Sequence, residues 1–156
     1  MNNEMGDFNP RAGLTTERGL IGTRPNLVAP GKRMLSSMSP TIIARAGRPV
    51  LVLGSPGGRT IINTVLGIIV NHLVHGLPIQ KAVDTPRLHH QWLPDRLQVE
   101  AGALPAATRA ALEKMGHVIQ QRGGSQGSAM ASSVRKDGKL EAGCDQRRPD
   151  SAAAGY

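Results

Sequence analysis

The segment that decides the fold is Val50-Leu-Val-Leu-Gly-Ser-Pro-Gly-Gly-Arg-Thr-Ile-Ile-Asn-Thr-Val-Leu-Gly-Ile-Ile-Val70. Its first four residues, Val50–Leu53, are a continuous apolar run, which predicts a buried central strand. The glycines of Gly54–Gly58 predict a sharp turn. After the turn, apolar residues recur every three or four positions, as in a helix that packs on a sheet. A strand, a glycine turn and a helix therefore follow one another directly.

The predicted helix extends from Ile61 to Val74, and Gly76 followed by Pro78 indicates where it ends. Ile68 and Val70 widen its apolar surface. We therefore expect this helix to be buried over much of its circumference.

On the N-terminal side, Thr41–Arg45 predicts a strand that pairs with Val50–Leu53 in a β-hairpin. Residues 9–30 predict a long loop, which in a compact domain is often a lid. Further expected elements are a short helix over 79–85, a strand over 97–100, an amphipathic helix over 105–115, a strand over 117–121, a flexible turn over 123–127 and a hairpin of strands 128–134 and 139–142. The order of strands, helices and strands predicts an α+β class or a layered αββα sandwich.

Composition limits the class of function. The 156 residues suit one modest domain or part of a larger one, and the formal charge is +8 with only 2% aromatic residues. Basic residues are spread along the sequence and few aromatics are available for base stacking, so we expect a basic surface and no nucleic-acid partner. The single cysteine, Cys144, excludes an internal disulfide. Neither a signal peptide nor a membrane span is expected from the sequence.

Two polar clusters precede the central segment. Glu4 and Asp7 could bind a substrate ammonium, although a solvated polar terminus has the same composition. Ser36 and Ser37 follow two basic residues, and their hydroxyls suit a small carboxylate or phosphate. The alternative for these serines is an ordinary turn before a strand.

The glycine turn is the third cluster. It lacks the Gly-Lys-Ser/Thr ending of a P-loop and the Gly-x-Ser-x-Gly pattern of a nucleophile elbow. The N–H groups of Gly57 and Gly58 could stabilise an oxyanion, or the glycines could serve the turn conformation alone. A metal site is not expected, because the four central histidines lack a third ligand at the right spacing: His72, His75, His89 and His90.

Taken together and in order, these motifs resemble the small subunit of the γ-glutamyltransferase (γ-glutamyl transpeptidase, glutathione hydrolase) family. The matching segments are 2–8, 30–42, 54–58, 86–94 and 145–156. The resemblance implies an N-terminal nucleophile hydrolase with an αββα fold. It also implies a precursor that cleaves itself into two subunits. The new N-terminal threonine then attacks a γ-glutamyl amide, and the acyl-enzyme is released to water or to an amine.

By resemblance, Glu4 and Asp7 would bind the α-ammonium of the glutamyl group, and Ser36 and Ser37 its α-carboxylate. The N–H groups of Gly57 and Gly58 would form the oxyanion hole. No cofactor is implied. The expected substrate is glutathione or another γ-glutamyl compound, and the expected location is periplasmic or extracellular.

Two departures from the family pattern shape the expectation. Gly6 stands where the family usually has aspartate. The Thr-Thr-His motif of the nucleophile is not present, and Thr15-Thr16, followed by Glu17, does not replace it. We therefore expect residues 1–156 to be the C-terminal part of a small subunit, a single partial domain that is inactive alone. Its partners would be the large subunit and the preceding part of the small subunit.

Two alternatives remain open at this point. A cephalosporin or glutaryl acylase shares the fold, but the combined acidic and serine clusters favour a zwitterionic glutamyl group over a diacid. The chain could also be a non-catalytic binding or assembly fragment.

Overall fold

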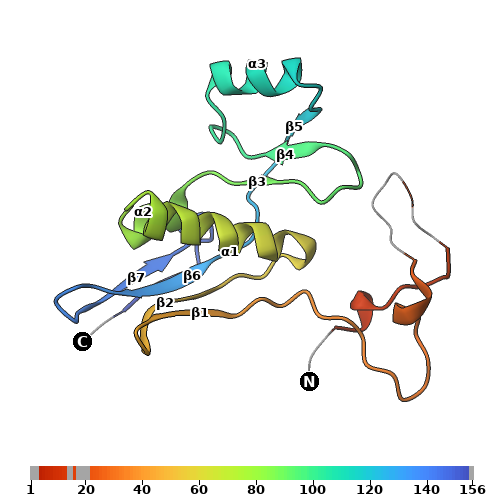
Figure 1. Cartoon of the computed structure of the whole chain (residues 1–156), viewed down its shortest axis with the longest axis horizontal. Helices are drawn as coiled ribbons and strands as arrows, with labels where there is room; N and C mark the ends of the chain where they lie inside the picture. The colour runs from red at the N-terminus through yellow and green to blue at the C-terminus, as the bar shows by residue number, and fades with distance from the viewer. Residues whose placement is uncertain (1–3, 14–15, 17–21, 155–156) are drawn as a thin grey trace.

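A four-stranded antiparallel sheet in the order β1-β2-β6-β7 forms the base of the molecule (Figure 1). The computed structural model describes residues 4–13, 16 and 22–154. The strands are β1 (Thr41–Arg45), β2 (Arg48–Gly54), β6 (Met130–Val134) and β7 (Leu140–Cys144). Both predicted hairpins are confirmed. In the first, Ala46 and Gly47 have φ of 50° and 75°, as a two-residue turn between twisted strands requires.

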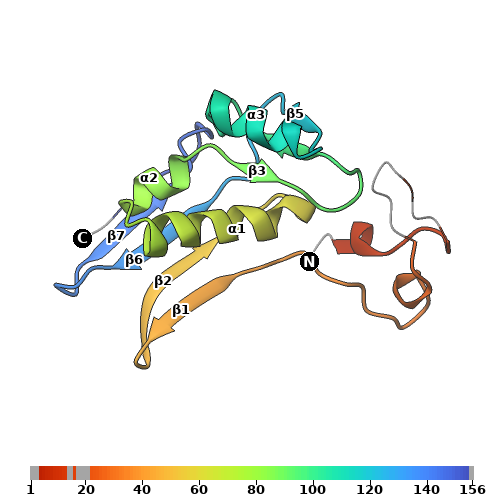
Figure 2. The ribbon, with the colours of Figure 1, turned by 45° about the horizontal axis from the view of Figure 1, so that its top comes forward.

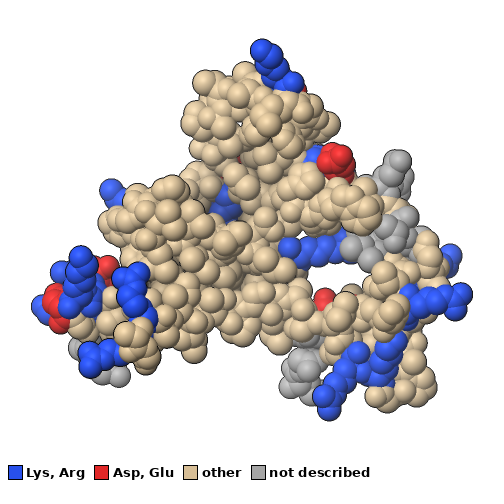
Figure 3. Space-filling view, in the orientation of Figure 1, with Lys and Arg blue, Asp and Glu red and all other residues tan. Residues whose placement is uncertain are grey.

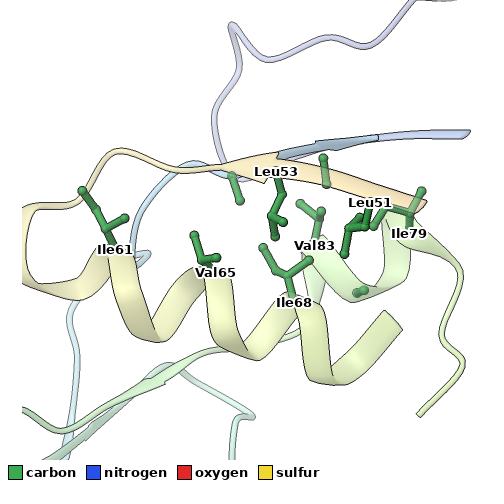
Figure 4. Packing of buried hydrophobic residues seen from close by; sticks show 10 residues of the cluster. Leu51, Leu53, Ile61, Val65, Ile68, Ile79 and Val83 are labelled. Carbon is green, nitrogen blue, oxygen red and sulfur yellow. The ribbon is translucent and has the colours of Figure 1, made fainter. Parts of the chain in front are cut away.

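Two helices cover one face of this sheet (Figure 2). A short 3₁₀ turn (Gly58–Thr60) leads into α1 (Ile61–Ile69), which continues as a π-helical turn (Val70–Val74), and α2 (Ile79–Asp84) follows. Side chains at every second position of β2 meet those at every third or fourth position of α1. The labelled core residues in Figure 4 are Leu51, Leu53, Ile61, Val65, Ile68, Ile79 and Val83.

The expectation that α1 is buried over much of its circumference is wrong. Ile62 and Leu66 are 62% and 55% exposed, because the sheet and α2 contact the opposite side of the helix. The sheet also has an open face, on which Ile42 and Val52 are 71% and 44% exposed. Within the described residues, the main sheet and its two helices therefore form one sheet layer and one helix layer, each with exposed apolar side chains on its outer side.

A smaller three-stranded sheet lies beyond the helix layer (Figure 1). It consists of β3 (Leu88–His89), β4 (Leu97–Val99) and β5 (Ile119–Gln121), with α3 (Ala106–Lys114) connecting the parallel pair β4 and β5. The predicted helices and strands between 79 and 121 are confirmed to within a few residues. No helix in the described ranges is long and apolar enough to cross a membrane.

The described residues before β1 form an N-terminal arm (4–13, 16 and 22–40), which extends away from the sheet (Figures 1 and 2). The arm contains two short 3₁₀ turns, Glu4–Asp7 and Arg24–Asn26. It is joined to the sheet by an extended segment that leads into β1.

The helix layer and the sheet are in backbone contact at α2 and β7. The side-chain amide of Gln80 accepts from the N–H of Cys144 (3.1 Å) and donates to its carbonyl (2.7 Å), so it acts as an additional partner for this edge strand. A Cβ at Gly143 would lie 3.0 Å from the carbonyl oxygen of Ile79. Glycine at 143 therefore permits the close approach of α2.

We expect Gly143→Ala to destabilise the chain by about 1–3 kcal/mol, because the new methyl group meets backbone that cannot move freely. Gly67→Ala is the matched control. It lies inside α1, where an added Cβ meets nothing within 4 Å, so the free energy of unfolding should rise by about 0.5–1 kcal/mol. Urea unfolding of both variants measures the difference. Equal stabilities would contradict the proposed contact.

Candidate functional site

A pocket of about 640 Å³ lies where the N-terminal arm meets the end of the glycine turn. It is lined by Met5–Pro10, Thr23, Asn26, Val28, Leu35 and Arg59. Two of the lining residues, Asp7 and Arg59, have opposite charges, and most of the remaining lining residues are apolar. Such a lining suits a small zwitterion.

Asn26 connects two of the predicted motifs. Its side chain is buried, donates to the carbonyl oxygen of Asp7 (2.6 Å) and accepts from the N–H of Leu35 (3.1 Å), the residue before Ser36. The acidic motif and the serine motif are therefore held together by one amide. The sequence around Asn26 gives no signal of this role, because an asparagine beside a proline in a long loop is typical of any turn.

Backbone hydrogen bonds join the two described sides of the predicted loop 9–30. The N–H of Asn9 donates to the carbonyl of Asn26 (2.8 Å), and the N–H of Gly13 donates to that of Gly22 (2.8 Å). Thr15 and Glu17 lie outside the described residues. A lid role for this loop stays a prediction.

Only some of the predicted site residues line the pocket. Asp7 lines the pocket, while the side chain of Glu4 lies outside the described part of the chain. Ser36 is exposed and Ser37 half-buried; neither lines the pocket, although their neighbour Leu35 does. The structure thus brings Asp7 close to the serine motif without showing the serines in the pocket wall.

The glycine turn ends beside the same pocket, although neither Gly57 nor Gly58 lines it. Gly57 and Gly58 are exposed, and the next residue, Arg59, lines the cavity. Gly57 has φ +144° and Gly58 φ +55°, conformations that favour glycine. Among the described residues, no acceptor is paired with either N–H group. Two backbone donors are therefore available at a solvent-accessible turn, as an oxyanion site requires.

A buried network of two arginines and two carboxylates lies behind the turn. The Nη1 atom of Arg87 is 2.9 Å from Oδ2 of Asp145, and the Nε atom of Arg147 is 2.7 Å from Oδ1 of the same carboxylate. Nη1 of Arg147 is also 2.8 Å from Oε2 of Glu100. Both arginines donate to the carbonyl of Val83 at the end of α2 (2.7 and 2.8 Å).

The network also fixes Gln126, which has no exposed surface. Its N–H donates to Glu100, and its carbonyl accepts from Arg87. The prediction of a flexible turn over 123–127 is therefore wrong at its C-terminal end. Hydrogen bonds to Glu100 and Arg87 determine the backbone conformation at Gln126. The glycine-rich composition of the segment does not predict these long-range contacts.

The electrostatics of the network favour the charged form of Asp145. Burial alone would raise its pKa, but the hydrogen bond from Arg147, the charge of Arg87 and the N–H of Ala129 together lower it. The pKa of Arg87 is lowered, mainly by burial and then by Arg147, while the two carboxylates oppose this effect. The two positive and two negative charges compensate one another in the interior.

The histidines contact groups near them in the sequence and do not cluster in one site. Nδ1 of His72 is 2.8 Å from the carbonyl of Leu77, Nε2 of His89 is 2.8 Å from Gln91, and His90 is 3.2 Å from Asp95. Within the ranges that the structure describes, no three His, Cys, Asp or Glu side chains are grouped as metal ligands would be.

Basic side chains are less evenly distributed in space than along the sequence. Many gather at two ends of the molecule, over the N-terminal arm and over the hairpin turns of the main sheet (Figure 3). At the hairpin end, Arg135 is 3.2 Å from Glu141 and 3.4 Å from Asp137, so part of its charge is compensated. The absence of a nucleic-acid partner stays a prediction.

Comparison with known proteins adds independent information. A family model described as Gamma-glutamyltranspeptidase matches residues 1–155. The chain is 45% identical over 156 residues to a glutathione hydrolase proenzyme of Escherichia coli K12, of which it spans 27%. A crystal structure of a mutant gamma-glutamyltranspeptidase from Helicobacter pylori matches 95% of this chain with 81% of its own, at 40% identity and a TM-score of 0.85.

A cephalosporin acylase from Bacillus halodurans is also similar. It matches 90% of this chain with 26% of its own, at 26% identity and a TM-score of 0.78. The α+β class is thereby confirmed, and the main sheet with its helix layer covers part of the αββα sandwich of the N-terminal nucleophile hydrolases.

We expect Asn26→Ala to separate the acidic motif from the serine motif. Loss of the acceptor for the N–H of Leu35 should speed exchange of that amide about fivefold, since one hydrogen bond contributes roughly 1 kcal/mol. Asn63→Ala on α1, outside this pocket, is the control. Hydrogen exchange followed by NMR measures both, and unchanged protection of Leu35 would contradict the bridge.

We expect Asp145→Asn to destabilise the chain by about 3–5 kcal/mol, because it leaves two arginines around an uncharged group. Asp137→Asn in the exposed β6–β7 turn should cost less than about 1 kcal/mol. Thermal unfolding compares the two variants. A similar small loss in both would show that the buried network contributes little.

The same carboxylate predicts a pH dependence. Its pKa is lowered in the native state, so its stabilisation is complete above the unfolded value of about 3.9 and is lost as the pH falls through the lower native value. Unfolding free energies measured between about pH 5 and pH 2 should fall more steeply for the wild type than for Asp145→Asn. Parallel curves would exclude this contribution.

Proposed function

The chain belongs to the γ-glutamyltranspeptidase family, and on that premise we propose that it forms the substrate-binding and oxyanion-stabilising part of a γ-glutamyl-transferring enzyme. The whole enzyme would transfer a γ-glutamyl group from glutathione or another γ-glutamyl amide to water or to an amino acid or peptide. The observation that carries this proposal is the pocket lined by both Asp7 and Arg59, the residue that directly follows Gly58.

The proposed roles follow from the charge of the substrate. Asp7, together with Glu4, binds the α-ammonium by charge-assisted hydrogen bonds, and the hydroxyls of Ser36 and Ser37 bind the α-carboxylate. The carbonyl oxygen that becomes negative during acyl transfer accepts from the N–H groups of Gly57 and Gly58. The unpaired state of those two N–H groups within the described chain supports this role.

The nucleophile of the reaction lies outside this part of the site. We propose that a threonine from another segment attacks the γ-carbonyl carbon, and the resulting tetrahedral intermediate then expels the amine and leaves a γ-glutamyl ester. Water or a second amine attacks this ester and restores the hydroxyl. The present chain contributes binding and charge stabilisation to both steps.

We also propose that partner chains cover the exposed apolar surface of this chain. The open face of the sheet and the outer side of α1 carry exposed apolar residues such as Val52 and Ile62. The large subunit and the preceding part of the small subunit would cover this surface. A periplasmic or extracellular location follows from the family resemblance.

The acylase alternative is less well supported. A simple diacid acyl group such as glutaryl lacks the α-ammonium that Asp7 suits. The sequence is also less similar to the acylase than to the gamma-glutamyltranspeptidase, with 26% against 40% identity. A non-catalytic assembly fragment is distinguished by the binding experiment below.

We expect the full 156-residue chain to bind glutathione weakly in isothermal titration calorimetry. Asp7→Asn and the double variant Ser36→Ala/Ser37→Ala should each weaken binding about tenfold or more, since hydrogen bonds to charged groups contribute about 1.5–3 kcal/mol. Asp150→Asn, at an exposed position in the C-terminal segment, should have no effect. Equal binding by all variants would refute the assigned subsite, and no binding by the wild type would favour an assembly role.

The same preparation should release no nitroaniline from γ-glutamyl-p-nitroanilide, because the proposed nucleophile is not among its residues. Release that depends on Asp7 would show that a residue of this chain acts as the nucleophile.

A further inference from the structure

The direction of a peptide N–H is fixed when the carbonyl of the same peptide group is fixed. The C=O and N–H of a trans peptide point in opposite directions across a rigid plane. The N–H of Gly57 shares its peptide with the carbonyl of Pro56, and the N–H of Gly58 shares its peptide with the carbonyl of Gly57. The partners of these two carbonyls therefore determine where the two candidate oxyanion donors point.

Ser55 holds the first carbonyl. Its hydroxyl donates to the carbonyl oxygen of Pro56 (2.7 Å) and accepts from the N–H of Ser128 (3.1 Å). Because Ser128 supplies a hydrogen to the hydroxyl oxygen, the hydroxyl hydrogen is directed at Pro56. The Ser55 side chain thus links the glycine turn to the chain that enters β6.

Thr60 holds the second carbonyl. Both its hydroxyl (3.0 Å) and its N–H (3.2 Å) donate to the carbonyl oxygen of Gly57. A Cβ at Gly57 would lie only 2.7 Å from Oγ1 of Thr60, so the absence of a side chain at 57 permits this contact. The second peptide plane is therefore fixed by two donors from one residue.

Gly127 permits the approach of the segment that carries Ser128. Its φ is +72°, and a Cβ there would lie 2.5 Å from Oγ of Ser55 and 3.1 Å from the carbonyl oxygen of Pro56. The preceding residue, Gln126, is bound to Glu100 and Arg87 of the buried network. The position of the Ser128 N–H is thus set by the interior of the protein.

We propose that Ser55 and Thr60 are positioning residues, whose hydroxyls hold the peptide groups of Pro56 and Gly57 so that the N–H groups of Gly57 and Gly58 are preorganised for an anion. This inference rests on the proposed function of those two N–H groups. Preorganised donors stabilise developing charge without reorganisation during the reaction, whereas a free glycine turn would have to be ordered first. Ser55 itself acts through Gly57 and does not contact substrate.

The orientation can be measured on the ¹⁵N-labelled full chain by residual dipolar couplings, which report the direction of each N–H bond. Ser55→Ala should change the coupling of Gly57, and Thr60→Val should change that of Gly58, while couplings in β2 and α1 stay constant. Ser55→Thr and Thr60→Ser retain the hydroxyl and should restore the wild-type values. Ser132→Ala, on the exposed side of β6, is the control.

Unchanged couplings of Gly57 in Ser55→Ala and of Gly58 in Thr60→Val would overturn the inference. A Gly127→Ala variant provides a second test. Its methyl group should displace the Ser55 side chain and alter the Gly57 coupling, although Ser55 and Thr60 themselves are unchanged. If Gly127→Ala fails to fold, the Ser55 and Thr60 variants still decide the matter.

Binding of an anion tests whether this orientation matters. A titration with 2-amino-4-phosphonobutyrate, which carries a tetrahedral anion in place of the γ-amide, should shift the amide resonances of Gly57 and Gly58. Ser55→Ala should weaken this binding about five- to tenfold, as loss of roughly one hydrogen bond predicts, and Ser55→Thr should restore it. Altered couplings with unchanged affinity would overturn the positioning role.

The two proposals fail separately. If the wild type shows no shift of the Gly57 and Gly58 resonances on titration, their oxyanion role is refuted. The couplings still show in that case whether Ser55 and Thr60 orient the two N–H groups. If the wild type binds and shifts but the hydroxyl variants behave like it, the oxyanion role stands and the positioning inference is refuted.

Discussion

A carboxylate with no exposed surface, that of Asp145, lies between two arginines, and much of the structure depends on this arrangement. A buried charge is tolerated only when its partners are correctly placed, so Arg87 and Arg147 cannot move independently. The same arginines hold the end of α2 through the carbonyl of Val83, and Arg147 pairs with Glu100 after β4. The main sheet, the helix layer and the small sheet are thereby connected at one point.

From this point, a chain of contacts reaches the surface. Glu100 and Arg87 fix Gln126, and two residues later the N–H of Ser128 meets the hydroxyl of Ser55. The glycine turn is exposed to solvent, yet its peptide planes are fixed by groups that connect to the interior. This arrangement combines accessibility for a ligand with the rigidity that electrostatic stabilisation needs.

The apolar surface is distributed as in one part of a layered sandwich. The core of the described chain forms between β2, α1 and α2, where the apolar face of the strand meets the apolar faces of the helices. Outside this contact, Ile42, Val52 and Ile62 have apolar side chains in solvent. Apolar patterning along a sequence does not distinguish burial within a chain from burial by a partner, and this is why the expected burial of α1 was too extensive.

The sequence by itself determined the local elements. The periodicity of Val50–Val70 and the turn residues before it predicted the strand, the helix and the first hairpin, and the turn residues at 136–138 predicted the second hairpin. These features depend on neighbours a few residues apart. The residue types within short motifs likewise pointed to Glu4 and Asp7, to Ser36 and Ser37, and to the glycine pair. Only the tertiary structure decided which of these residues meet. The bridge made by Asn26, the pairing of Asp145 with Arg87 and the contact of Ser55 with Ser128 join residues far apart in the chain, and no local pattern encodes the distance between them.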